Sequence, residues 1–358
     1  MGSVFAVFDV VPFAVRLLEY QDGDRLGHAL ALGIDPHAYF AMKRWEILLP
    51  QQELLDNLVW ILWMARIHNI QLSSALESQI RERIHRLLSQ LYPPRCPGGG
   101  RGAMEAAVQD YEYAYLLRGD DPQVYFDYPP DRAAAGDCSA APDRKPFRPF
   151  YPAGEYPDLW RGGDPKYGAG LGAWRARGEV RDLVCRYHQD PQARTRGVQM
   201  TSFQVPRELP GVLRDIQNAL LAVLQKHHIA IECNPSSNVL IGPIEHYIEH
   251  PILRFYNREL TLPGSGPDPG SGPDSSTDPG LPASHQLLVS INTDDAGIFG
   301  TSLETEYALL ARALEKKKGR DGKPVHKPHD VYAWLNSIRL MGLDLSFRDR
   351  SPSPSDEP

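Results

Sequence analysis

Apolar residues recur at helical spacing in two stretches of the chain, residues 50–92 and residues 210–225. The first stretch is long enough for two helices, and Ser74 and Glu77 have the spacing of a capping box at the start of the second. We therefore expect that second helix to begin at Ser74 and to stop before Pro93. Residues 210–225 present one continuous apolar side and predict a further helix. That side consists of Val212, Leu213, Ile216, Leu220 and Leu224.

Two short apolar runs, His228–Asn234 and Gln286–Asn292, have the length and composition of buried strands. The first run follows the helix at residues 210–225. The second is followed by a capping box at Thr301 and Glu304, which predicts another helix that ends near Gly319. Strands and helices that alternate at this length are typical of a parallel sheet or a (β/α) barrel. The sequence therefore favours the α/β fold class.

Composition divides the chain into an opening segment at residues 1–40, an insertion at 41–200 and an α/β segment at 205–350. The insertion begins with the helices of residues 50–92. From Cys96 to Arg196 it is rich in Pro, Gly, Asp, Arg and aromatic residues without a sustained period, which predicts irregular, ordered structure. Residues 261–284 carry a near repeat of GSGPD and are expected to form a flexible surface loop, and residues 351–358 a disordered tail.

The charge balance excludes some classes of partner. Of the 358 residues, 38 are basic and 45 are acidic, and the formal net charge of −7 argues against binding to nucleic acid or to anionic lipid. No apolar run reaches the length of about 18 residues that a membrane span needs. The four cysteines form no CxxC pair, and residues 1–20 lack the basic start of a secretory signal. We expect a cytoplasmic protein.

Polar residues that could carry chemistry follow the predicted strands. Asp294 and Asp295 come directly after the second strand, at a position that builds the active site in (β/α) barrels. One carboxylate could ligate a metal while the other accepts a hydrogen bond from substrate. Alternatively, one of them caps the next helix and the other is solvated. Ser236, Ser237 and Asn238 after the first strand, and His28 near the start, either line a cleft or stabilise the local structure.

Taken together, these segments resemble one enzyme family. Arg25-Leu-Gly-His-Ala, Ile231–Asn238 and Ser290–Asp295 occur in the order of strands six, seven and eight of adenosine deaminase-like enzymes. The resemblance covers residues 22–36 and 205–350, and it implies a partial (β/α) TIM-type barrel with a large helical and irregular insertion. The opening GDRLGHALALGIDP and the insertion look closer to the large antiphage deaminases that work beside an ATPase.

The resemblance implies a metal-dependent aminohydrolase that deaminates a purine, either adenosine or an adenine nucleotide, through a zinc-activated water. By the same resemblance, Asp294 is the zinc ligand and Asp295 accepts a hydrogen bond from N7 of the purine. His28 is implied to orient the hydroxide. Ser236, Ser237 and Asn238 are implied to support the rim of the substrate site.

The zinc ligands of the family are incomplete in this sequence. The family uses an HxH pair, a further histidine and a glutamate from earlier strands, and this chain contains no HxH and no HAGE motif. A catalytic zinc needs about three protein ligands. The pairs His246/His250 and His326/His329 have suggestive spacing, but solvated or capping roles are expected for them.

Two hypotheses follow from this gap. Either a partner chain carrying the N-terminal half of the barrel completes an enzyme, or the chain is a catalytically inactive, truncated module that acts in assembly or regulation. In the second case the helices of residues 50–92 and the insertion would form a subunit interface. A homo-oligomer is compatible with both hypotheses.

Overall fold

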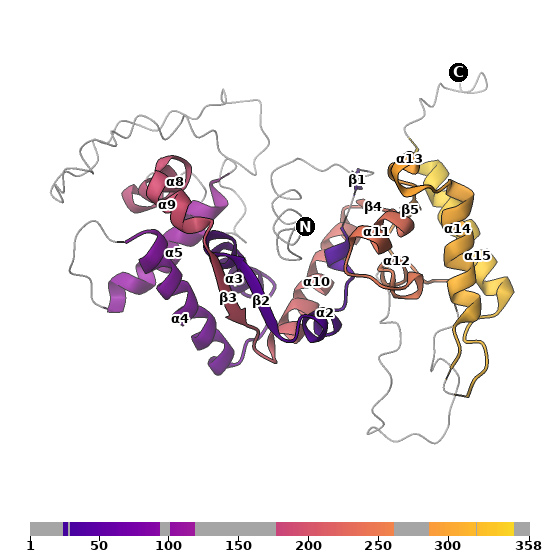
Figure 1. Cartoon of the computed structure of the whole chain (residues 1–358), viewed down its shortest axis with the longest axis horizontal. Helices are drawn as coiled ribbons and strands as arrows, with labels where there is room; N and C mark the ends of the chain where they lie inside the picture. The colour runs from indigo at the N-terminus through magenta and orange to yellow at the C-terminus, as the bar shows by residue number, and fades with distance from the viewer. Residues whose placement is uncertain are drawn as a thin grey trace, which may run out of the picture. The chain divides into compact units, whose positions relative to one another are not determined.

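The computed structural model describes residues 24–27, 29–93, 101–118, 177–260, 286–319 and 321–346, with side chains in the third range given from residue 107. These residues form two compact units. Residues 24–35 and 217–346 make up the first, here called the sheet unit, and residues 36–216 make up the second, the helical unit (Figure 1). The opening residues 1–23, His28, the loop at 261–284, the tail at 351–358 and the middle of the insertion lie outside the described residues.

A three-stranded parallel sheet forms the centre of the sheet unit. Its strands are β1 (Arg25–Leu26), β4 (Ala230–Cys233) and β5 (Val289–Ile291), and they lie side by side in that order. Leu26 lies opposite Ile231, which in turn lies opposite Val289. The strands β4 and β5 are buried along almost their whole length, as expected for a parallel sheet covered on both faces. The two strands and the parallel pairing predicted from the alternating pattern are therefore confirmed.

Helices pack around this sheet. The unit contains the second half of α10 (Leu209–Lys226), the short helices α11 (Pro235–Ile241), α12 (Ile252–Phe255) and α13 (Ala296–Phe299), and two 3₁₀ turns, η1 (Leu30–Leu32) and η4 (Tyr247–Glu249). The longer helices α14 (Leu303–Lys316) and α15 (Pro328–Asp344) lie side by side, and α15 packs on β5 (Figure 1). Trp334 of α15 is fully buried, and its ring N–H donates to the carbonyl oxygen of Tyr256 at 3.0 Å.

The helical unit combines helices with a two-stranded antiparallel sheet that has one exposed face. Its strands are β2 (Glu46–Pro50) and β3 (Met200–Gln204), with Leu48 opposite Ser202. Its helices are α2 (Pro36–Met42), α3 (Gln51–Ile67), α4 (Ser74–Leu91), α5 (Arg101–Leu116), α8 (Gly178–Gln189), α9 (Pro191–Gly197) and the first half of α10.

Three of these helices correct the expectation of irregular structure between Cys96 and Arg196. Where this segment is described, it forms α5, α8 and α9. The apolar side of α5 is built from Val108, Tyr111, Ala114 and Tyr115. Because tyrosine supplies much of that side, a search for aliphatic residues at helical spacing misses it.

At both predicted helix starts the N-cap is the neighbouring hydroxyl residue, and the third residue after it is Leu76 or Thr305 rather than the glutamate of a capping box. The hydroxyl of Ser73, rather than that of Ser74, accepts the N–H of Leu76 at the start of α4, at 3.1 Å. At the start of α14, Ser302 rather than Thr301 accepts the N–H of Thr305. In both places two hydroxyl residues are adjacent, and the spacing alone does not decide which one becomes the cap.

A buried polar network connects the helices of the helical unit. Asp56 of α3 accepts hydrogen bonds from both terminal nitrogens of Arg118, at 2.6 and 2.8 Å, and from the hydroxyl of Tyr111, at 2.6 Å. The guanidinium of Arg118 also lies 3.8 Å from the ring centre of Tyr187 on α8. Burial lowers the pKa of Arg118, but the adjacent Asp56 carboxylate more than reverses this and holds the pKa well above its usual value.

Among the described residues, no helix is both long enough and apolar enough to cross a membrane.

Candidate functional site

The candidate site lies where β4 and β5 end. Since the two strands are parallel neighbours, with Cys233 opposite Ile291, the segments that follow them start side by side. The hydroxyl of Ser237, on α11 after β4, donates a hydrogen bond to Oδ2 of Asp294, after β5, at 2.8 Å. The structure thus brings together two of the residues that the sequence had placed in a site.

Asp294 is held in an unusual conformation. Its φ of 56° lies in the left-handed region, which aspartate and asparagine tolerate better than most residues. Just before it, the side chain of Asn292 accepts the N–H of Thr293 at 2.8 Å and donates to Glu232 of β4 at 3.1 Å. Glu232 in turn faces Arg25 of β1, with 3.7 Å between the charged atoms. The loop that presents Asp294 is therefore connected to both of the other strands.

Asp295 has a different partner from its neighbour. Its Oδ1 accepts the N–H of Ile298 at 2.9 Å, so Asp295 is the N-cap of α13. The structural alternative for the two aspartates was that one caps the next helix and the other is solvated. The cap is present, at Asp295. Asp294 is exposed, yet it has a defined partner in Ser237. A carboxylate has two oxygens, so capping through Oδ1 is compatible with a second role for Asp295.

Ser236 is placed by a buried carboxylate that sequence reasoning missed. The backbone N–H of Ser236 donates to Oε2 of Glu306 at 2.8 Å, and the Ser236 hydroxyl lies 3.2 Å from that of Tyr247. Glu306 is fully buried on α14, and its other oxygen accepts the hydroxyl of Thr301. The signal was present in the sequence, because Glu306 is four residues before Leu310 and so falls on the core side of that helix.

Asn238 points to a buried histidine. Nδ1 of His250 accepts the N–H of Ile252 at 3.1 Å, so the ring proton is on Nε2, which donates to Oδ1 of Asn238 at 3.0 Å. Oδ1 of Asn238 also accepts the N–H of Asn234. His250 therefore matches the capping alternative of the solvated or capping role that was expected, and it is buried. His326 is likewise buried rather than solvated.

Burial of His250 makes stability depend on pH. Burial lowers the pKa of His250 to about 3, whereas an unfolded chain has a histidine pKa of about 6.5. The unfolded state thus binds a proton that the folded state does not. The contribution of neutral His250 to the free energy of unfolding is complete above pH 6.5. It is lost, by up to about 1.4 kcal/mol per pH unit, as the pH falls toward 3.

The free energy of unfolding is measured by urea denaturation of the wild type and of His250→Gln between pH 4 and pH 7.5. Its change per pH unit should be smaller in the variant. His85→Gln is the control, because this histidine lies on α4 in the helical unit and is not one of the site residues. Equal slopes in all three proteins would contradict the argument.

The described residues do not by themselves make up a zinc site. Within the described ranges, no three His, Cys, Asp or Glu side chains are grouped closely enough to hold a metal ion. Asp294, the residue predicted to ligate zinc, is among the described residues. His28, which is predicted to orient the hydroxide, is not. Cys233 is buried at the end of β4, and burial raises the pKa of its thiol, which disfavours the thiolate that binds metals.

Part of the chain is similar to a known deaminase. Over 96 residues the chain is 30% identical to the aminodeoxyfutalosine deaminase of Streptomyces avermitilis. The matched segment is 27% of this chain and 19% of that protein, so the chain spans less than a fifth of the relative. No family model matches the chain. The similarity therefore relates part of this chain to part of a deaminase.

Proposed function

We propose that this chain supplies strands six to eight of the (β/α) TIM-type barrel of an adenosine deaminase-like aminohydrolase. The observation that carries the proposal is the hydrogen bond between Ser237 and Asp294, which joins the ends of two parallel strands in the predicted order. Side chains at the carboxyl ends of such strands build the active sites of barrel enzymes. The similarity to a deaminase supports the same conclusion.

The proposed reaction is the hydrolytic deamination of a purine, adenosine or an adenine nucleotide. In this proposal Asp294 ligates a zinc ion that activates water, and Asp295 accepts a hydrogen bond from the purine. His28 assists the water, and Ser236 and Asn238 stabilise the rim. The donation from Ser237 to one oxygen of Asp294 fixes the orientation of the carboxylate, as partners of metal ligands commonly do.

The proposal requires zinc ligands from beyond the described residues. Since Asp294 provides one ligand and a catalytic zinc needs about three from protein, we propose a partner polypeptide with the N-terminal half of the barrel. This partner carries the HxH pair, the further histidine and the glutamate. It also pairs with the short outer strands β1 and β5, beyond which the described residues place no further strand of this sheet.

A second candidate function is a catalytically inactive module that acts in assembly or regulation. The hydrogen bonds of the two aspartates favour it, because Asp295 caps α13 and Asp294 binds Ser237 within the chain. Both carboxylates then have structural partners that account for them without a metal.

One experiment separates the two functions. The chain is purified alone and together with a polypeptide carrying the missing motifs. Ammonia release from adenosine, deoxyadenosine, AMP, ATP and adenine is then measured alongside bound zinc. The enzyme proposal expects zinc and ammonia release from the pair and neither from the chain alone. A pair that forms a complex but remains free of zinc and inactive would support the module instead.

A further inference from the structure

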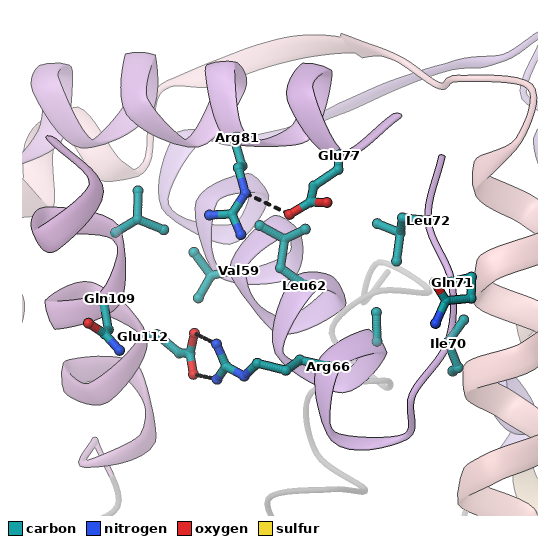
Figure 2. A pocket seen from close by; sticks show the side chains of 12 residues that line it. Val59, Leu62, Arg66, Ile70, Gln71, Leu72, Glu77, Arg81, Gln109 and Glu112 are labelled. Carbon is teal, nitrogen blue, oxygen red and sulfur yellow. Dashed lines mark hydrogen bonds and ion pairs between the residues drawn. The ribbon is translucent and has the colours of Figure 1, made fainter. Parts of the chain in front are cut away.

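The helical unit contains a cavity that has no part in the site described above. It has a volume of about 550 Å³ and opens between α3, α4, α5 and the connection from α3 to α4 (Figure 2). This volume is within the range of about 300–1,000 Å³ that is typical of small-molecule sites. The apolar part of its lining consists of Val59, Leu62, Ala65, Ile70, Leu72 and Val108.

Two ion pairs border the apolar wall. Both terminal nitrogens of Arg66, on α3, donate to the carboxylate of Glu112, on α5, with 3.1 Å between Nη1 and Oε2. On α4, Nε of Arg81 donates to Oε1 of Glu77 at 2.9 Å. Figure 2 shows the side chains of Arg81 and Arg66 approaching the cavity from opposite sides, with Leu62 between them.

The exposure of the Arg66–Glu112 pair decides which charge a ligand meets. The side chain of Arg66 is 59% exposed, whereas that of Glu112 is 7% exposed and has both oxygens occupied by Arg66. A guanidinium carries five N–H donors, and Glu112 receives two of those of Arg66. An incoming group therefore meets a cation with remaining donors, while each oxygen of the carboxylate behind it already accepts a hydrogen bond from that cation.

We propose that this cavity binds a small molecule with an apolar body and one anionic oxyacid group, a carboxylate or a phosphate. The apolar body lies on Val59 and Leu62. The anionic group accepts hydrogen bonds from Arg66, which then bridges the ligand and Glu112. Across the cavity, Arg81 is paired with Glu77, which lines the same wall and is 43% exposed, so this pair adds no net charge and the sign of the ligand is set by Arg66. The proposal concerns the helical unit alone and does not depend on the deaminase activity.

Four probes with eight carbon atoms each test the charge. Octanoate, octyl phosphate, octanol and octylammonium are titrated below their micelle concentrations into the full chain, and binding is measured by calorimetry and by saturation-transfer NMR. We expect both anions to bind and octanol to bind roughly tenfold more weakly, the equivalent of one charge-assisted hydrogen bond. Octylammonium should bind most weakly of the four. The ratio between octanoate and octyl phosphate identifies the preferred acid.

Three variants place the binding in this cavity. Leu62→Trp fills the space and should abolish binding of every probe. Arg66→Gln should weaken the anions and leave octanol unchanged, with circular dichroism checking that the variant is folded. Arg86→Gln is the control, because it also removes an arginine that is ion-paired with a glutamate, Glu82, but Arg86 does not line the cavity.

Several outcomes would overturn the proposal. Octanol that binds as tightly as octanoate would remove the role of the charge, and tighter binding of octylammonium would reverse its sign. Unchanged affinities in folded Leu62→Trp would place the probes elsewhere on the chain. Absence of binding by both anions would show that the cavity is not a site for this class of ligand.

Discussion

Replacing Asp56 by alanine is expected to lower the free energy of unfolding of the helical unit by about 3–5 kcal/mol, the usual cost of removing one partner of a buried ion pair. Asp56 is the acceptor for Arg118 and Tyr111 in the network that connects α3, α5 and α8. Without it, the guanidinium of Arg118 stays among tyrosine rings and has lost the carboxylate that holds it. The loss is large because an unpaired buried charge keeps its full desolvation cost.

Urea denaturation followed by tryptophan fluorescence measures this effect, since Trp60 and Trp63 are buried on α3 beside the network. Glu82→Ala is the matched control. It breaks the exposed pair with Arg86 and should cost at most about 0.5 kcal/mol. Replacing both Asp56 and Arg118 by leucine should recover part of the loss. If Asp56→Ala costs no more than Glu82→Ala, the network does not stabilise the unit.

Substitutions at the aspartate pair should separate metal binding from catalysis in the completed enzyme. Asp294→Ala removes the one zinc ligand that this chain is proposed to supply, so bound zinc and ammonia release should disappear together. Asp295→Ala should retain zinc but lower kcat by about 10²–10⁴-fold, the contribution of a positioned hydrogen-bonding or proton-transfer group. Ser237→Ala should weaken zinc binding by about 10–100-fold through loss of its hydrogen bond to Asp294.

Zinc content by mass spectrometry and ammonia release on the same preparations distinguish these roles. Because Asp295 also caps α13, Asp295→Asn is needed beside Asp295→Ala. Asparagine is as good a helix cap, so its activity loss reports the missing negative charge rather than an unravelled helix. Asp321→Ala is the control. It changes an exposed aspartate that is not part of the site, and it should change neither the zinc content nor the ammonia release. Equal loss of zinc from the Asp294 and Asp295 variants would contradict the division of roles.

The parts of the fold that the sequence predicted are those with a local signal. His228–Asn234 and Gln286–Asn292 are apolar runs bounded by polar residues, and each contains the strand that the structure shows. The pairing of β2 with β3 has no such signal. Glu46 and Ser202 are 156 residues apart, and neither strand indicates its partner by composition. Pairings at such a separation are decided by how the whole unit packs.

The candidate site divides in the same way. Asp294 and Ser237 were predicted because each directly follows a strand, and parallel strands bring such positions together. The burial of Glu306 and of His250 was not predicted, because a charged or polar group is stable in a core only when it has partners there. Those partners, the N–H of Ser236 and the side chain of Asn238, belong to other segments of the chain.

The pairing of β2 with β3 also bears on how such a chain can evolve. Pro50 lies opposite Met200, and the N–H of Gln51 donates to the carbonyl oxygen of Gln199 at 2.9 Å. The segment of residues 51–199 thus begins and ends at neighbouring positions, where β2 pairs with β3. A segment whose two ends are held side by side can change in length, or be exchanged between genes, at little cost in loop-closure entropy, provided that the pairing of β2 with β3 is kept.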